Sequence, residues 1–341
     1  MVDVKSSGGS ESSGAARSKR WGRRRVIAGL GLGMLVAGAG AIAATSAWRV
    51  RDAARRFPPI GAFETVEGVR LHLLDQGARD APAIALIHGA SGNLRDFGFG
   101  FTEALLERGL RVIAIDRPGH GHSERGPSDA HRPDVQARLM RGALAARGVE
   151  RALLLGHSLG GAPALAWALD APDSVLGLCL VGGVAMPWPG GIDLIYRVNS
   201  TPIVEFAASA AMNAFVSEGY VEAAVASIFR PQAPPQGYAA AIGAPLALRP
   251  ATLRANAEDV AFLKEYLRGQ APRYPTLRVP IEALHGAADT IVPARVHAEP
   301  LSQSAPNARL TLLPGVGHMP HHTARRAVLA AVERLRRAGG L

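Results

Sequence analysis

The sequence predicts an α/β protein in which helices cover both faces of a mostly parallel sheet, with a separate apolar segment at the N-terminus. Three observations predict this architecture. From Phe57 onward, short apolar runs typical of buried strands alternate with longer helix-like runs. Residues 187–275 interrupt the alternation with Ala- and Pro-rich helix-like sequence, and residues 26–48 contain no charge. The chain has 341 residues and is 48% hydrophobic, which is enough for one large domain with a sizeable core.

The net charge of +10 belongs mainly to the N-terminus. Residues 1–56 contain eleven Lys and Arg and only three acidic residues, whereas residues 57–341 are close to neutral. A nucleic-acid groove needs a basic surface on the folded domain. This charge distribution therefore argues against a nucleic-acid partner.

The chain before the domain at 57–341 divides into two expected parts. Residues 1–25 are rich in Ser, Gly and basic residues and are expected to form a disordered basic tail. Residues 26–48 are long enough for a helix of about 34 Å, which could span a bilayer. Basic residues are more numerous before this segment than after it, which favours a membrane anchor with the domain outside the cytoplasm.

Two alternatives stay open for residues 26–48. "RRRVI" resembles a twin-arginine export signal, and "TSA" before Trp48 resembles a cleavage site. In that case the domain is exported and soluble after the segment is removed. The segment could also be a helix buried against the domain, since basic residues stand at both of its ends.

The elements of the domain follow in chain order. "FETVEGVRLHLLDQG" has two strand-like runs around a Glu-Gly turn and predicts a hairpin. The later expected strands are "AIALIHG", "RVIAID", "RALLLG", "VLGLCLVGG", "VPIEALHG" and "ARLTLLPG". The expected helices are 93–108, 133–147, 159–170, "VPARVHAEPLSQ" and 322–338. The insertion at 187–275 has the length of a helical cap rather than a loop.

Ser158 lies in Gly156-His157-Ser158-Leu159-Gly160, which matches the G-x-S-x-G pattern of a nucleophile elbow. A strand-like run precedes the serine and a helix-like run follows it, which is the local context that this pattern needs. The tight turn exposes the hydroxyl, and the N-terminus of the helix favours developing negative charge.

A serine hydroxyl is a weak nucleophile, so it needs a base, and the base needs an orienting acid. The expected chain order is Ser, then acid, then His. "ALHGAADTIVP" places Asp289 after one strand-like run, and "LLPGVGHMPHH" places His318 after the last one. Open α/β sheets form their sites at the carboxyl ends of their strands, which is where both residues are expected.

With these motifs, and with "HGASGN" and "DRPGHGHS" in the same order, the sequence resembles the α/β-hydrolase superfamily over residues 63–338. The resemblance implies the α/β-hydrolase fold with a helical cap. It implies that Ser158 is the nucleophile, His318 the general base and acid, and Asp289 its orienter. It also implies an oxyanion hole made by the backbone N–H groups of Ala90 and Leu159. No cofactor is expected, and no metal, because no H-E-x-x-H pattern occurs and most histidines lie in Gly-rich turns.

The resemblance implies a serine hydrolase that cleaves a carboxylic ester or a related acyl bond of a small, apolar substrate through an acyl-enzyme. Hydrolysis of a C–C bond and peracid formation use the same triad and stay open. A membrane-tethered, non-catalytic binding protein on the same fold is a further alternative, against which the complete triad argues. The sequence leaves the oligomeric state open.

Overall fold

The computed structural model describes residues 11–191 and 202–340. Its centre is an eight-stranded sheet with the strand order β1-β2-β4-β3-β5-β6-β7-β8. The first three strands in this order pair antiparallel, and every later pair is parallel. The strands are β1 (Ala62–Val66), β2 (Val69–Gln76), β3 (Ala83–Ile87), β4 (Arg111–Ile115), β5 (Ala152–His157), β6 (Val175–Val181), β7 (Ile281–Gly286) and β8 (Ala308–Leu313). The predicted hairpin and the predicted parallel sheet are confirmed.

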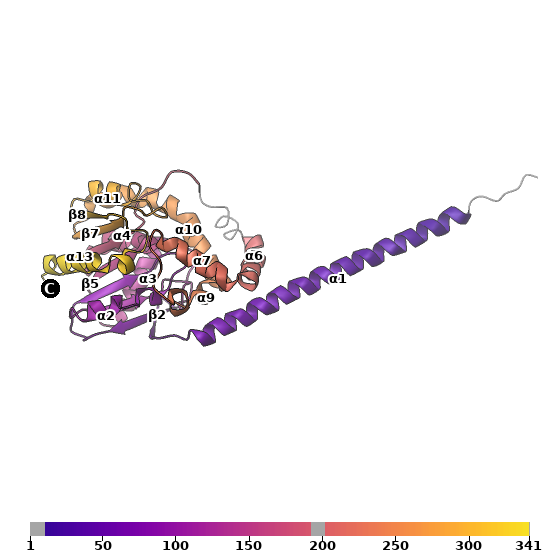
Figure 1. Cartoon of the computed structure of the whole chain (residues 1–341), viewed down its shortest axis with the longest axis horizontal. Helices are drawn as coiled ribbons and strands as arrows, with labels where there is room; N and C mark the ends of the chain where they lie inside the picture. Colours follow the sequence, from indigo (N-terminus) through magenta and orange to yellow (C-terminus); the bar gives the residue numbers. More distant parts are fainter. Residues whose placement is uncertain (1–10, 192–201, 341) are drawn as a thin grey trace, which may run out of the picture.

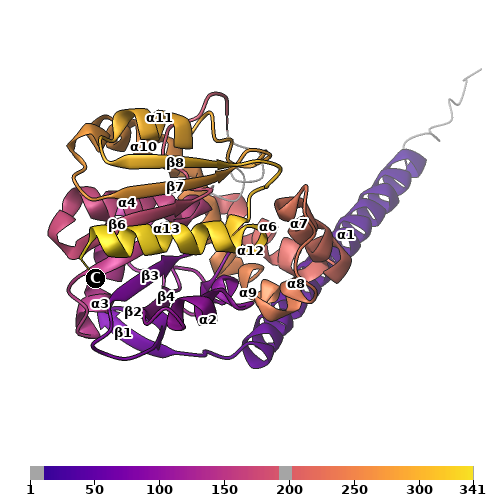
Figure 2. The same ribbon diagram turned by 60° about the vertical axis from the view of Figure 1, so that its left-hand side comes forward.

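Helices cover both faces of the sheet because the buried strands are apolar on both sides. On β3, Ala83, Ala85 and Ile87 face one core while Ile84 and Leu86 face the other, as the twofold repeat of a strand requires. The first core is closed by α3 (Pro133–Ala146), α4 (Gly161–Asp170) and α11 (Ala298–Ser304). The second is closed by α2 (Phe101–Leu106) and α13 (Arg325–Ala338), which lies across the sheet in Figure 2.

Two expected helices are broken in the structure. The run predicted at 93–108 forms a 3₁₀ turn, η1 (Leu94–Phe97), followed by α2. Phe99 and Gly100 between them have φ of 57° and 80°, a left-handed conformation that ends a helix. The run predicted at 322–338 is also divided, into α12 (Pro320–Thr323) and α13. Apolar periodicity predicted the presence of these helices but not the turn inside each of them.

The insertion between β6 and β7 is a helical cap, as predicted for 187–275. Residues 192–201 lie outside the described part of the chain. The described cap consists of α6 (Pro202–Phe215), α7 (Glu218–Phe229), α8 (Tyr238–Ala241), α9 (Ala244–Ala247), α10 (Pro250–Gln270) and the 3₁₀ turn η4 (Ala271–Thr276). In Figure 1 the cap lies between the sheet and the N-terminal helix.

The N-terminal helix α1 (Glu11–Arg56) is longer than the sequence predicted. Its first turns replace part of the expected disordered tail, because Ala, Arg and Lys in residues 15–25 are strong helix formers; residues 1–10 lie outside the described part. Its last turns contact the cap: Arg49 donates hydrogen bonds to the carbonyls of Asn213 (2.8 Å) and Val216 (2.7 Å), and Ala53 is buried. The rest of α1 extends away from the domain (Figure 1).

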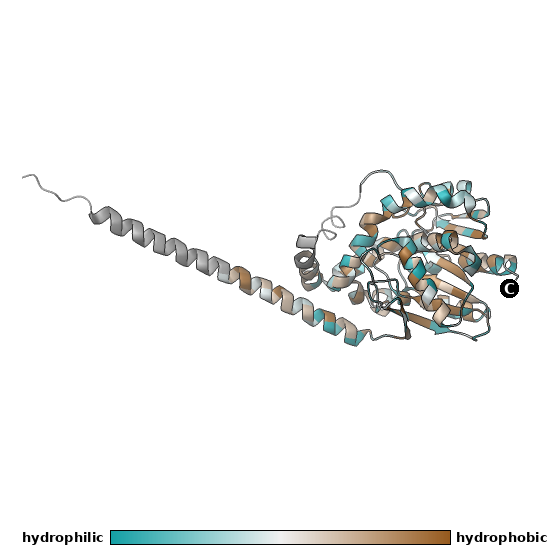
Figure 3. Cartoon of the chain, turned by 180° about the vertical axis from the view of Figure 1, so that it is seen from behind, coloured by the Kyte–Doolittle hydropathy of each residue, from teal (hydrophilic) through white to brown (hydrophobic). Residues whose placement is uncertain are grey.

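The predicted apolar segment at 26–48 lies within α1, and the side chains of residues 26–32 are outside the described part. Among the described side chains, Met34, Leu35 and Val36 are 64–73% exposed, and the helix becomes more hydrophilic toward the domain (Figure 3). Within the part of the chain that was described, no helix is both long and apolar enough to cross a membrane.

Candidate active site

The predicted nucleophile stands in a strained turn between β5 and α4. Ser158 has φ of 51°, a left-handed conformation that L-residues rarely adopt. The turn can form because glycines flank it: a Cβ on Gly160 would lie 2.3 Å from the carbonyl oxygen of Ile87, and one on Gly156 would lie 2.6 Å from that of Gly160. The strand–turn–helix context expected of a nucleophile elbow is therefore present.

The structure brings the three predicted catalytic side chains together at the carboxyl ends of β5, β7 and β8. His318 Nε2 lies 2.9 Å from Ser158 Oγ, and His318 Nδ1 lies 2.7 Å from Asp289 Oδ2. All three residues are at least nine-tenths buried. Since a carboxylate only accepts hydrogen bonds, Nδ1 carries the proton and Nε2 faces the serine with its lone pair. This is the tautomer that can accept the proton of Ser158.

Asp289 is held as an anion by donors on several sides. Its Oδ1 accepts hydrogen bonds from the backbone N–H groups of Ile291 (2.9 Å) and Val292 (3.0 Å), and His285 Nε2 lies 3.4 Å from Oδ2. Burial alone would raise the pKa of Asp289, but the hydrogen bonds with His285 and His318 outweigh it and hold this pKa well below its usual range. The carboxylate thus stays charged and orients His318.

The loop that follows β3 lies against the nucleophile, where the oxyanion hole was predicted. A Cβ on Gly89 would lie 2.9 Å from Ser158 Cβ, so this position tolerates only glycine. Ala90 follows directly, and Leu159 follows Ser158. The assignment of the N–H groups of Ala90 and Leu159 to the oxyanion hole stays a prediction.

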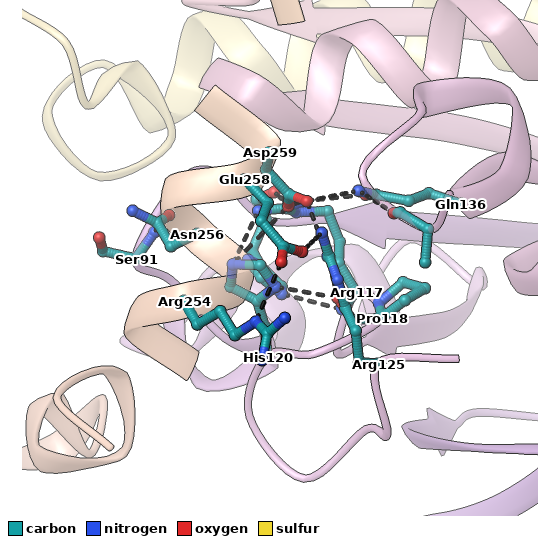
Figure 4. Close-up of polar contacts among 12 residues, drawn as sticks. Ser91, Arg117, Pro118, His120, Arg125, Gln136, Arg254, Asn256, Glu258 and Asp259 are labelled. Atoms are coloured by element: carbon teal, nitrogen blue, oxygen red, sulfur yellow. Dashed lines mark hydrogen bonds and ion pairs between the residues drawn. The ribbon is translucent and has the colours of Figure 1, made fainter. Parts of the chain in front are cut away.

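A buried polar network fixes this loop to the cap, and no sequence pattern predicted it (Figure 4). Arg117 is fully buried and donates through Nε to the carbonyl of His88 (3.0 Å) and through Nη2 to the carbonyl of Gly89 (3.1 Å). Its Nη1 donates to Asp259 on α10 (2.6 Å), and Asn256 on α10 accepts from the N–H of Ser91 (2.7 Å). Helix α10 therefore holds the predicted oxyanion loop at two points.

Asp116, beside Arg117, orients no catalytic group. Its carboxylate accepts hydrogen bonds from the backbone N–H groups of Leu94 (2.7 Å) and His122 (2.8 Å) and contacts His72 Nδ1 (2.7 Å). The carboxylate therefore fixes the "DRPGHG" turn, which is a structural role.

A buried apolar cluster lies beside the nucleophile. This cluster joins the two predicted oxyanion residues to cap and core side chains, and its members are Leu159, Ala162, Val184, Leu263, Leu267 and Val292, with Ala90, Trp188 and Val260 packed against it.

Comparison with known proteins gives the family. The family model described as "Alpha/beta hydrolase family" matches residues 84–332. The chain belongs to this family. The match covers the strands from β3 to β8, the cap and the positions of Ser158, Asp289 and His318 in this hydrolase.

Relatives of this alpha/beta hydrolase include a 2-hydroxy-6-oxononadienedioate/2-hydroxy-6-oxononatrienedioate hydrolase of Paraburkholderia phymatum, 34% identical over 156 residues, which are 43% of this chain and 54% of the relative. The chain thus spans about half the length of that curated relative. An uncharacterized protein of Mycobacterium tuberculosis (Rv2715) is 31% identical over 306 residues, covering 84% of this chain and 82% of the relative. Among solved structures, the 2-hydroxy-6-oxo-6-phenylhexa-2,4-dienoate hydrolase of Rhodococcus sp. strain RHA1 has a TM-score of 0.66 at 20% identity, covering 81% of this chain and all of the other. That likeness shows the fold.

Proposed function

We propose that this alpha/beta hydrolase cleaves a bond next to a carbonyl group through an acyl-enzyme on Ser158. The observation that carries the proposal is the buried path from Asp289 through His318 to Ser158 Oγ. His318 takes the serine proton as Oγ bonds to the carbonyl carbon, and the oxyanion faces the predicted donors at Ala90 and Leu159. The bond to the leaving group then breaks, and the leaving group takes the proton from His318. Water repeats the sequence on the acyl-enzyme and releases a carboxylic acid.

For the bond that is cleaved, we propose a carbon–carbon bond of a small oxo acid. Support comes from the relatives named for 2-hydroxy-6-oxo acids, which include a 2-hydroxymuconate semialdehyde hydrolase of Pseudomonas sp., 36% identical over 152 residues. In such a reaction the leaving carbon takes the proton from His318, so the leaving group must be one whose negative charge a neighbouring carbonyl stabilises. The apolar cluster beside Ser158 suits the acyl half of the substrate.

Hydrolysis of a carboxylic ester is the second candidate, favoured by the same apolar cluster. An ester oxygen is a better leaving group than carbon, and the triad needs no other change to release it. An apolar acyl chain would meet the partly buried members of this cluster, Ala90, Trp188 and Val260, and this contact would distinguish esters by chain length.

A substrate panel separates the two candidates. We would measure kcat/KM for 2-hydroxy-6-oxo-6-phenylhexa-2,4-dienoate and for p-nitrophenyl esters of increasing acyl length, with the Ser158→Ala variant as background. If the bond is carbon–carbon, the oxo acid should exceed the best ester by at least about 100-fold, or roughly 2.7 kcal/mol of transition-state binding. The opposite ranking would make the protein an esterase. If Ser158→Ala still hydrolysed both substrates, the proposed acyl-enzyme on Ser158 would be contradicted.

We also propose that residues 26–48 anchor the protein in a membrane with the hydrolase domain outside the cytoplasm. The proposal rests on the uncharged run and on the exposure of Met34, Leu35 and Val36 on a helix that extends away from the domain. The full chain should sediment with membranes and be released by detergent but not by molar salt, because salt screens only charge attraction. A full-length chain that salt releases, or a mature soluble chain beginning near Trp48, would contradict the anchor.

The matched control is a chain lacking residues 1–44. It keeps Arg49 and Ala53, which contact the cap, and should be soluble and fully active. An insoluble or inactive product would mean that the deleted residues stabilise the domain.

A further inference from the structure

A second group of side chains with metal-ligand chemistry lies behind the triad and takes no part in the mechanism above. It consists of Asp96 on η1, His157 at the end of β5 and His321 on α12. The three offer one carboxylate oxygen and two ring nitrogens that all lie within 4.8 Å of one another. Each of the three residues is at least nine-tenths buried, so water does not solvate this group.

The hydrogen bond of His157 fixes which of its nitrogens is available. His157 Nε2 lies 3.1 Å from the backbone carbonyl oxygen of His318. A carbonyl oxygen only accepts, so Nε2 carries the hydrogen and a neutral ring presents a bare lone pair at Nδ1. Nδ1 has no hydrogen-bond partner and lies 3.7 Å from Asp96 Oδ2. Two electron-rich atoms thus face each other in a buried site, which is unfavourable unless a proton or a metal cation stands between them.

His321 completes the same arrangement from another element. Its Nε2 lies 3.4 Å from Asp96 Oδ2, and neither of its ring nitrogens has a hydrogen-bond partner. Neutral imidazoles with free lone pairs are metal ligands rather than charged partners of the carboxylate.

We propose that Asp96, His157 and His321 bind a zinc ion. Two imidazoles and one carboxylate suit Zn²⁺, whose bonds of about 2.0–2.1 Å separate neighbouring tetrahedral ligand atoms by roughly 3.3 Å. Asp96 Oδ2 lies 3.4 and 3.7 Å from the two ring nitrogens, and the three ligand atoms all lie within 4.8 Å of one another, so a zinc ion would draw the group together. The hydrogen bond from His157 to the His318 carbonyl is the contact that a metal-bound histidine ordinarily makes with its second nitrogen.

The ion would have a structural role. It would join the strand that carries Ser158 to the segment that carries His318, because His157 precedes the serine and His321 lies three residues after the catalytic histidine. The sequence predicted no metal because it contains no helical H-E-x-x-H pattern. These ligands come from three separate elements, and no spacing rule relates them.

Metal analysis of the full chain tests the proposal independently of any substrate. The protein would be purified through a tag without histidine and without chelators, and its metals measured by mass spectrometry. We expect about one zinc per chain, reduced at least tenfold in Asp96→Asn and His321→Gln. His131→Gln, which removes a histidine outside the group, should retain the zinc. Less than about 0.1 transition-metal ion per chain, or equal zinc in all four proteins, would overturn the proposal.

A second measurement covers the case in which the variants fail to fold. The unmutated chain would be stripped by chelator and titrated with zinc while its melting temperature is followed. A buried site that binds only the folded state should raise the melting temperature by about 5–10 °C at saturation, and magnesium should not. An unchanged melting temperature would show that a proton or a rearranged ring satisfies the site instead.

Discussion

Replacing Ser158 with alanine should abolish both turnover and covalent labelling. Ser158 Oγ is 2.9 Å from His318 Nε2 in a turn that strains the backbone to expose it. Removing the hydroxyl leaves no atom to form the acyl-enzyme, so kcat should fall by on the order of 10⁴- to 10⁶-fold. A fluorophosphonate probe should label the unmutated chain once and the variant not at all.

The matched control is Ser227→Ala on cap helix α7, where the hydroxyl is exposed and bonds only to its own helix. This variant should keep full labelling and full turnover. If Ser158→Ala were still labelled, another nucleophile would be responsible. If it kept turnover without labelling, catalysis would not pass through an acyl-enzyme.

The second large effect is expected for Asp289→Asn. An asparagine can keep the two backbone hydrogen bonds at Oδ1, but its amide nitrogen then faces His318 Nδ1. This contact favours the tautomer with the proton on Nε2, which cannot accept the proton of Ser158. We expect kcat to fall by about 10⁴-fold, with a correctly folded protein. The exposed Asp173→Asn is the control and should change neither activity nor fold.

The same variant should also change how the free energy of unfolding depends on pH. The pKa of Asp289 is lowered in the folded state, so the carboxylate stabilises the protein above the unfolded value of about 3.9, and this contribution is lost as the pH falls below it. The difference in free energy of unfolding between the unmutated chain and Asp289→Asn should therefore shrink in acid. A constant difference from neutral to acidic pH would show that Asp289 is not held as an anion by its neighbours.

Sequence alone predicted those parts of the molecule that depend on residues close together in the chain. Each buried strand is a short apolar run, and Ser158, Asp289 and His318 each follow such a run, so their meeting at one edge follows from a parallel sheet. The turn inside 93–108 depends on left-handed residues that periodicity does not reveal. Helix α1 extends to Glu11 because residues 15–25 contain several strong helix formers. The Ser- and Gly-rich composition of residues 1–25 had predicted disorder there instead.

The parts that sequence did not predict depend on contacts between distant residues. Arg117 and Asp259 are 142 positions apart and meet only because α10 of the cap packs over the loop after β4. Asp96, His157 and His321 are brought together by a 3₁₀ turn, a strand end and a short helix. In each case the residue types are common, and only the fold brings them close enough to interact.

The two halves of helix α10 make different contacts with the site. One stripe of the helix begins with Asn256, which accepts from Ser91, and Asp259, which binds Arg117, so that both support the loop around Ala90. The stripe continues with Leu263 and Leu267, which join the apolar cluster that contains Leu159. The first half therefore fixes the loop after β3, and the second half packs in the cluster that contains Leu159. Substitutions at Leu263 or Leu267 should loosen the packing around Leu159, and substitutions at Asn256 or Asp259 should release the loop that carries Ala90, so that a single helix supports both predicted oxyanion residues.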